Sequence, residues 1–248
     1  MPKIFYRILF LIILLAVIFF FTNPNKNQSS TEDSFSTEST TEEISSVSYP
    51  IIVLDAGHGG FDPGKVGVND ILEKDINLSI VKKLQKLLED EGFTIYLTRE
   101  DDQLLAPLNS SSKKKDDMIA RVEMIRDLNP FFTISIHQNS FTDPSTSGPQ
   151  VFYYKDSEAS ATLAHVLQDI LNIQLNPPKK RMPQTNQNYY LLTRTPTPTV
   201  IVECGFLSNP SEADLLAQDT YQDKVAHAIF LGILSYYEST TSNQTPSE

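Results

Sequence analysis

The sequence predicts a single α/β domain with a mostly parallel central sheet flanked by helices. Short apolar runs rich in β-branched and aromatic residues alternate with longer segments of helical periodicity, and this alternation is typical of parallel sheets. Within each run the apolar residues follow one another directly, as expected for strands that are buried on both faces. The predicted strands are residues 50–55, 93–98, 131–136 and 200–203.

Four segments between and after these runs place their apolar residues on one stripe of a helix. They are residues 73–91, 116–128, 157–171 and 221–237. The first ends before Gly92, a residue that suits a helix C-terminal cap. Its apolar stripe comprises Ile76, Ile80, Leu84, Leu87 and Leu88. The folded domain is therefore predicted to occupy residues 49–238.

An unbroken apolar run covers residues 8–21, with Lys3 and Arg7 on its N-terminal side. We expect residues 1–22 to form an N-terminal transmembrane anchor or a signal segment. The uncleaved anchor is favoured, because no small residues of the kind that precede a cleavage site follow the run. The positive charges before it predict a single pass through the cytoplasmic membrane, with the folded domain on the extracytoplasmic side.

Two segments are too polar to contribute to a core. Residues 23–48 consist mostly of Ser, Thr, Glu and Asn, and they predict a disordered linker between the anchor and the domain. Residues 239–248 have the same character and predict a disordered tail.

The charge and the cysteine content exclude some classes of function. The chain has a net charge of -11 and an isoelectric point of about 4.8. A binder of nucleic acid needs a basic surface to displace counterions, so we expect no nucleic-acid partner. Cys204 is the sole cysteine, which excludes a disulfide within the chain.

Polar residues able to bind a metal or move a proton follow the predicted strands. His58 comes just after the first strand in a glycine-rich loop, His137 follows the third, and Glu203 ends the last. Glu73 begins the first helix. Because the carboxyl ends of parallel strands meet at one edge, these residues are expected to lie close together.

Two imidazoles and one carboxylate are suitable ligands for a catalytic Zn²⁺, with a fourth position left for water. His58, Glu73 and His137 are therefore the predicted metal ligands, and Glu203 is the candidate proton acceptor and donor. Each residue taken alone has a simpler explanation, such as a surface histidine or a glutamate that favours a helix N-terminus. The wide spacing makes the pattern less specific than a contiguous zinc motif.

Five sequence blocks resemble a known family. In order they are IIVLDAGHGGFDPG, LEKDINLS, LTRE, FTISIHQNS and VIVECGFLSNPSEADLL. They are similar to the signature blocks of N-acetylmuramoyl-L-alanine amidases of the zinc-dependent type called amidase 3. The resemblance implies cleavage of the amide between N-acetylmuramic acid and L-alanine in peptidoglycan. It also implies zinc held by His58, Glu73 and His137, with Glu203 as the catalytic acid or base.

The sequence departs from the family pattern without removing any of these four residues. Ala56 stands where proline is usual, Gln138 and Ser140 replace small apolar residues, and Cys204 replaces a branched aliphatic residue. Arg121 and Asn188 match recurring polar positions, although surface salt bridging or loop capping explains them equally well. His165 and His227 lie in helical patterns and are expected at the edge of the core.

The catalytic domain without wall-binding repeats resembles the subtype that acts in spore-cortex maturation, where peptide removal precedes formation of muramic δ-lactam. A polar, lysine-bearing loop at residues 104–117 also matches this subtype. The resemblance implies a protein activator or a downstream deacetylase as partners. The alternatives are a vegetative cell-wall autolysin or cell-separation amidase, a non-catalytic peptidoglycan-binding regulator, and a cysteine peptidase that uses Cys204.

Overall fold

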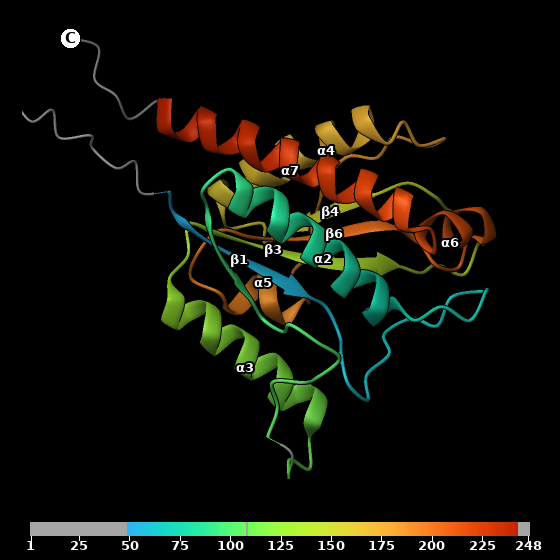
Figure 1. Cartoon of the computed structure of the whole chain (residues 1–248), viewed down its shortest axis with the longest axis horizontal. Helices are drawn as coiled ribbons and strands as arrows, with labels where there is room; N and C mark the ends of the chain where they lie inside the picture. The colour runs from blue at the N-terminus through green and yellow to red at the C-terminus, as the bar shows by residue number, and fades with distance from the viewer. Residues whose placement is uncertain (1–48, 108, 243–248) are drawn as a thin grey trace, which may run out of the picture. The chain divides into compact units, whose positions relative to one another are not determined.

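Six strands form one mixed sheet at the centre of the domain. The computed structural model describes residues 49–107 and 109–242, and their strand order is β2-β1-β3-β6-β4-β5 (Figure 1). The strands β2, β1, β3 and β6 run parallel to one another. The strand β4 runs antiparallel to β6, and β5 pairs parallel to β4. Their bounds are β1 Ile51–Ala56, β2 Thr94–Leu97, β3 Phe132–Asn139, β4 Gln150–Tyr153, β5 Gln184–Thr185 and β6 Thr199–Phe206. The predicted α/β architecture is confirmed.

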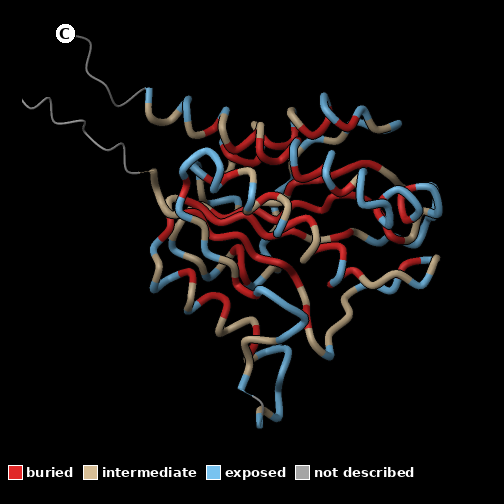
Figure 2. Tube along the Cα trace, viewed as in Figure 1, coloured by how far each residue is buried: buried red, intermediate tan, exposed pale blue. Residues whose placement is uncertain are grey.

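Helices cover both faces of the sheet, and the buried residues lie on the strands and on the sides of the helices that face them (Figures 1 and 2). The larger core packs one face against α2 Glu73–Asp90, α4 Glu158–Gln174 and α7 Asp219–Ser242. The smaller core packs Val53 of β1 against α3 Lys113–Leu128 and α5 Tyr190–Arg194. A short helix, α6 Pro210–Leu216, follows β6.

The predicted apolar stripe of α2 is confirmed for four of its five residues, and the fifth, Leu87, is partly buried against the same core. Ile76, Ile80, Leu84 and Leu88 are buried along one stripe. The helix stops because Gly92 adopts a φ of +96°, a conformation that is readily available to glycine. Phe93 follows, and its amide donates to the Leu88 carbonyl at 3.1 Å just before β2 begins at Thr94.

Two site residues lie further inside their strands than the sequence predicted. β3 continues past Ile136 to Asn139, and β6 continues past Glu203 to Phe206. The two extensions are mutually dependent, because His137 and Glu203 are directly paired across the parallel ladder. A β-bulge after His137 ends the regular register between the two strands.

Some predicted boundaries were wrong. α3 begins at Lys113, so the second part of the loop expected at residues 104–117 is helical. α7 continues through Ser242, four residues into the predicted tail. Its last turn is polar, but the hydroxyls of Thr240 and Thr241 donate to the Tyr236 and Tyr237 carbonyls at 3.0 and 2.9 Å. Such bonds let a polar segment continue a helix that packing has already started.

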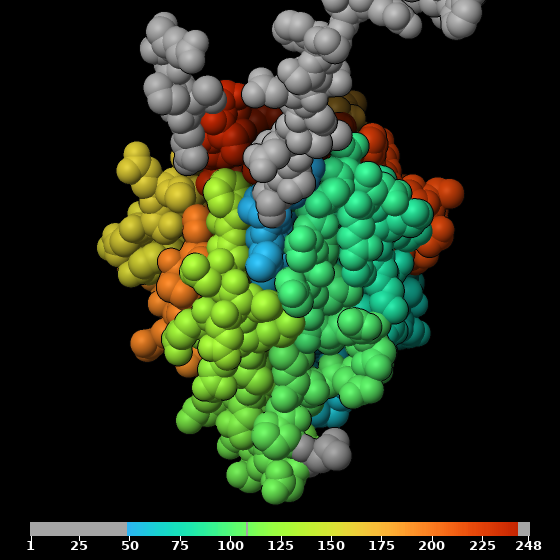
Figure 3. All heavy atoms as spheres, turned by 60° about the vertical axis from the view of Figure 1, so that its left-hand side comes forward, coloured from blue at the N-terminus to red at the C-terminus, as the bar shows by residue number. Residues whose placement is uncertain are grey.

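The surface of α3 and of the segment that leads into it, coloured green, fills the lower part of Figure 3. The predicted anchor at residues 1–22, the predicted linker at 23–48 and the end of the predicted tail at 243–248 lie outside the described residues. Among residues 49–107 and 109–242, no helix combines the length and the apolar character needed to cross a bilayer.

Candidate metal centre and active site

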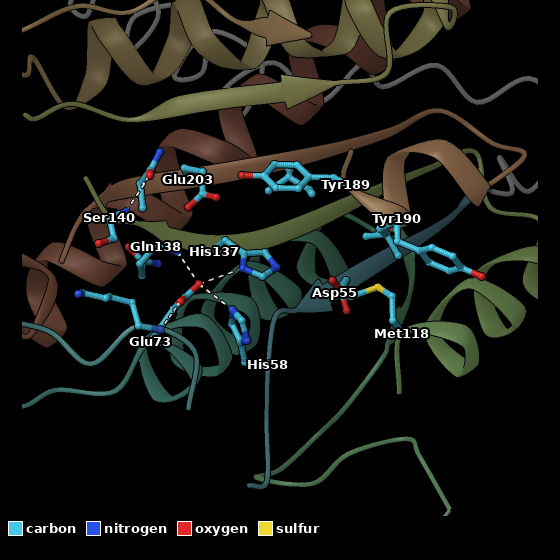
Figure 4. A pocket seen from close by; sticks show the side chains of 14 residues that line it. Asp55, His58, Glu73, Met118, His137, Gln138, Ser140, Tyr189, Tyr190 and Glu203 are labelled. Atoms are coloured by element: carbon cyan, nitrogen blue, oxygen red, sulfur yellow. Dashed lines mark hydrogen bonds and ion pairs between the residues drawn. The ribbon is translucent and has the colours of Figure 1, made fainter. Parts of the chain in front are cut away.

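Three predicted ligands converge at the carboxyl edge of the sheet. His58 lies two residues beyond β1, Glu73 is the first residue of α2, and His137 lies within β3 (Figure 4). One ligand atom from each can be chosen so that all lie within 4.8 Å of one another. Glu73 Oε1 is central, at 3.2 Å from His58 Nε2 and 2.9 Å from His137 Nδ1.

Backbone groups and a second carboxylate orient these ligands. The amide of Gln138 donates to Glu73 Oε1 at 3.0 Å, and the amide of Lys65 donates to Oε2 at 2.7 Å. His58 Nδ1 lies 3.0 Å from Asp62 Oδ2, which leaves Nε2 facing the centre. An imidazole held on one nitrogen by a carboxylate is the usual arrangement of a metal-binding histidine.

Two glycines leave the space that the ligands occupy. A Cβ on Gly57 would lie 2.2 Å from the His137 ring, and a Cβ on Gly64 would lie 2.5 Å from Glu73 Oε2. Gly64 also has a φ of +67°, which disfavours other residues. Glycine is therefore needed in this loop for two reasons, because a larger residue would collide with the predicted ligands and because the turn requires a positive φ.

His58 itself adopts a left-handed backbone conformation, with a φ of 62°. This conformation is uncommon for a residue other than glycine and persists where the surroundings hold it. The buried Arg121 supplies that restraint by donating Nη2 to the His58 carbonyl at 2.7 Å and Nη1 to the Ala56 carbonyl at 2.9 Å. Arg121 thus joins helix α3 to the loop that carries the first ligand.

Arg121 belongs to a buried network of opposite charges. It forms ion pairs with Asp55 and Asp117. Burial alone would raise the pKa of Asp55, but Arg121 and hydrogen bonds from Ser135 and Thr98 outweigh it and lower the pKa to about 2. Because Arg121 is 1% exposed, the alternative of a surface salt bridge is wrong for this residue.

Glu203 lies beside the three ligands and is buried. Burial raises the pKa of its carboxyl to about 7, against the opposing charges of His137 and His58. Its Oε2 is buried and has no hydrogen-bond partner among the described residues. A carboxyl with a pKa near neutrality and a free oxygen is suited to accept a proton and to give it back.

The four residues line one cavity of about 330 Å³. Its far wall includes Tyr189, the residue that precedes α5, and Leu191 of α5. Neither residue was predicted from the sequence. The Tyr189 hydroxyl points toward Glu203 in Figure 4. Burial and the charges of Glu203 and Glu73 raise the pKa of Tyr189 to about 12, so the phenol stays protonated. Two adjacent tyrosines are common on surfaces, and only the position of α5 over the sheet places Tyr189 in the cavity.

The donor set fits a divalent metal ion. Two imidazole nitrogens and a carboxylate converge on one point, they are oriented by outer partners, and a cavity adjoins them. In that arrangement His58, Glu73 and His137 would hold the ion and leave the cavity side open.

The other candidate residues do not enter the cavity. Cys204 is adjacent to Glu203 in β6, so its side chain points to the opposite face, into the larger core. Burial raises the pKa of its thiol, which excludes a reactive thiolate at this site. His165 and His227 lie on the exposed sides of α4 and α7 rather than at a core edge, and Asn188 is exposed in the loop before α5.

Comparison with known proteins agrees with this geometry. Residues 52–235 match the family described as N-acetylmuramoyl-L-alanine amidase. The chain is 39% identical over 194 residues to the germination-specific N-acetylmuramoyl-L-alanine amidase of Bacillus subtilis (strain 168), covering 77% of this chain and 81% of the relative. It is 29% identical over 230 residues to the amidase AmiA of Escherichia coli (strain K12), covering 75% and 76%.

Solved structures share the fold. The CwlD amidase of Clostridioides difficile, solved in complex with the GerS lipoprotein, superimposes with a TM-score of 0.74 at 39% identity and covers 77% of this chain and 99% of that one. The amidase AmiC2 of Nostoc punctiforme gives a TM-score of 0.67 at 31% identity, covering 76% and 97%. With its fold, its convergent histidines and glutamates and its matches over most of the domain, this chain belongs to the amidase 3 family of N-acetylmuramoyl-L-alanine amidases.

Proposed function

We propose that this amidase is zinc-dependent and that it uses His58, Glu73 and His137 as metal ligands and Glu203 as the proton shuttle. The observation that carries the proposal is the convergence of three ligand atoms within 4.8 Å beside the buried, unpartnered Oε2 of Glu203. Two histidines and a carboxylate form a ligand set that zinc hydrolases use, which supports zinc over harder ions that prefer oxygen ligands.

The reaction breaks the amide between the lactyl group of N-acetylmuramic acid and the L-alanine of the stem peptide. When bound, the ion would supply Lewis acidity toward the scissile carbonyl and the attacking water. Glu203 accepts a proton from that water and delivers it to the leaving nitrogen, so that the C–N bond breaks as a carboxylate and a free amine form. Tyr189 stays protonated and offers a hydrogen bond to the reacting groups.

The test is digestion of purified peptidoglycan by the full-length chain, followed by mass spectrometry of the released fragments. Activity lost on chelation and restored by Zn²⁺, with free peptides that begin with L-alanine, would support the proposal. Metal analysis of the purified protein supplies an independent readout, with one zinc per chain expected. Cleavage that persists in the metal-free protein would contradict zinc dependence.

We propose further that the substrate is the spore cortex and that peptide removal leads to muramic δ-lactam. The 39% identity to the germination-specific amidase of Bacillus subtilis (strain 168) supports this role over a vegetative one. In a strain that lacks this gene, the cortex is expected to contain intact stem peptides and no δ-lactam. A normal δ-lactam content in such spores, together with chained or poorly separated vegetative cells, would favour the cell-separation alternative.

We place the domain on the extracytoplasmic side of the cytoplasmic membrane, held by residues 1–22. The apolar run at residues 8–21 and the preceding charges support this location. Protease accessibility in intact protoplasts tests it, since an extracytoplasmic domain is cleaved there. A protein activator and a downstream deacetylase are the proposed partners, and the complex of the CwlD amidase with the GerS lipoprotein supports the first.

The retained ligands argue against a non-catalytic regulator. A protein that only binds peptidoglycan has no need of a buried carboxyl with a pKa near 7 beside convergent histidines.

A further inference from the structure

A second hollow continues from the metal cavity along the carboxyl edge of the sheet. This groove has a volume of about 390 Å³ and is lined by residues of β3, β4, β5 and β6, of the loop between β3 and β4, and of the segment before β5. Asn139 lines both the groove and the metal cavity. Phe152 of the groove also contacts Tyr189 of the cavity, with ring centroids 5.6 Å apart. The lining residues of the groove are Asn139, Phe141, Thr146, Gln150, Phe152, Lys179, Arg181, Gln184 and Phe206.

The groove begins on the side of Glu203. In the antiparallel ladder between β4 and β6, Gln150 is the direct partner of Glu203, and Gln150 lines the groove. Glu203 is the group that protonates the leaving nitrogen in the proposed reaction. That nitrogen belongs to the peptide, so the peptide extends from the Glu203 side of the centre.

Arg181 is held rigidly in this groove. Its Nε donates to the Ser147 carbonyl at 2.8 Å, and its Nη1 donates to Gln150 Oε1 at 3.1 Å. Its guanidinium lies over the Phe206 ring, 4.8 Å from the centroid. Among the described residues, no acceptor bonds to its buried Nη2. The guanidinium is held by these two hydrogen bonds and by the ring, and the residue is still partly exposed. It therefore presents a fixed positive charge that is suited to attract a carboxylate.

The positive charge of the groove is not neutralised by ion pairs. Within the described part of the chain, no carboxylate lies at ion-pair distance from Lys179 or Arg181. The nearby Glu212 is engaged by the amides of Gly148 and Phe206, each at 2.8 Å. A local cationic groove in a chain of net charge -11 therefore offers complementarity to an anionic ligand.

We propose that this groove binds the stem peptide of the substrate through its free carboxylates, with Lys179 and Arg181 as the cationic contacts. Phe141 and Phe152 supply apolar surface for the aliphatic parts of the peptide. The inference rests on the proposed function for the direction of the peptide. The groove thereby determines which stem peptides are accepted, because amidation of a carboxylate removes the charge that the two cations recognise.

The chain offers a matched pair of variants for the test. Lys179 and Lys180 are adjacent and both exposed, but only Lys179 lines the groove. Binding of a free stem peptide with unmodified carboxylates to the full-length protein is measured by calorimetry for Lys179→Glu and Lys180→Glu. The expected result is about tenfold weaker binding for Lys179→Glu and little change for Lys180→Glu. The wild-type protein is expected to bind the fully amidated peptide about as weakly as Lys179→Glu binds the unmodified one.

A second test measures peptide binding by Arg181→Gln, which removes the charge, and by Arg181→Lys, which keeps it. The proposal that the groove binds the peptide carboxylates predicts weaker binding in Arg181→Gln and partial recovery in Arg181→Lys. Both variants should unfold at temperatures similar to that of the wild type. Equal affinities for the two lysine variants, or equal binding of unmodified and amidated peptide by the wild type, would overturn it. Because peptide binding is measured without turnover, failure of this inference is distinguishable from failure of the proposed hydrolysis.

Discussion

Arg121 reaches from helix α3 to donate Nη2 to the backbone carbonyl of His58 at 2.7 Å, so a buried cation restrains a proposed metal ligand through its main chain. The contact explains how His58 keeps a φ of 62°. It also makes the geometry of the proposed metal centre depend on a helix that supplies none of the proposed ligands.

Arg121→Ala is expected to lower the free energy of unfolding by about 3–5 kcal/mol, because Asp55 and Asp117 would remain buried without their partner. Arg121→Lys keeps the charge but loses the fork that spans two carbonyls, so metal affinity is expected to fall at least about tenfold with the fold retained. Urea unfolding and a competitive metal-binding assay measure the two effects. Arg126→Ala is the control, since Arg126 is exposed on the same helix. Equal metal affinity in Arg121→Lys and wild type would contradict the restraint.

Glu203→Gln is expected to reduce turnover by about 10²–10⁴-fold while the metal content stays at the wild-type level. The amide keeps the size of the side chain but cannot accept the proton. Peptide release measured by mass spectrometry and metal measured by elemental analysis provide the two readouts. Loss of metal in this variant would show that Glu203 acts as a ligand.

His58→Ala is expected to lose both metal and turnover, because it removes one of three convergent ligand atoms. His165→Ala is the matched control, since His165 is exposed on α4. Metal content that is equally low in both variants would point to a general effect of histidine removal rather than to this centre.

Gly64→Ala tests the packing of the ligands. The added Cβ would lie 2.5 Å from Glu73 Oε2 and 2.6 Å from His58 Cδ2, at a φ of +67°. We expect metal affinity to fall at least about tenfold and stability to fall by about 1–2 kcal/mol. Gly67→Ala is the control in the same loop, because the nearest atom to its added Cβ is Ile71 Cγ1, at 3.0 Å. A Gly64→Ala protein with unchanged metal affinity would show that the loop adapts.

The buried network also predicts how stability depends on pH. The pKa of Asp55 is lowered to about 2 in the folded protein, so its ionised form stabilises the fold above the ordinary value of 3.8. That contribution, about 2 kcal/mol, is lost as the pH falls from about 4 toward 2. The difference in unfolding free energy between wild type and Asp55→Asn is therefore expected to shrink over this range. A difference that stays constant from pH 6 to pH 2.5 would argue against the assigned shift.

The parallel strands and the convergence of His58, Glu73 and His137 could be predicted because both follow from local patterns. Buried strands read as continuous apolar runs, and residues that follow parallel strands meet at one edge. The strand β4 was not predicted, because its four residues QVFY contain too little pattern to distinguish a strand from a loop. The helix α5 has five residues, too few to show helical periodicity.

The roles of residues whose partners lie far away in the sequence could not be predicted from the sequence. Arg121 looks like any charged residue on an amphipathic helix until α3 packs on the sheet and buries it against Asp55. Arg181 gains its orientation from Ser147 and Gln150, more than 30 positions earlier in the sequence. In both cases the relevant partner is set by tertiary packing, which single-sequence patterns do not encode.

His137 and Glu203 are paired in the central ladder of the sheet, whereas His58 lies in a loop beyond β1. These two parts of the site are therefore expected to differ in their resistance to local unfolding. Backbone hydrogen bonds between central strands exchange their protons most slowly, because breaking them requires nearly global unfolding. His58 instead is restrained by Arg121 of α3, a helix that takes no part in that ladder. Transient release of α3 would therefore free one ligand and leave the other half of the centre assembled. Loss of the ion would follow this partial opening and would not require the whole domain to unfold.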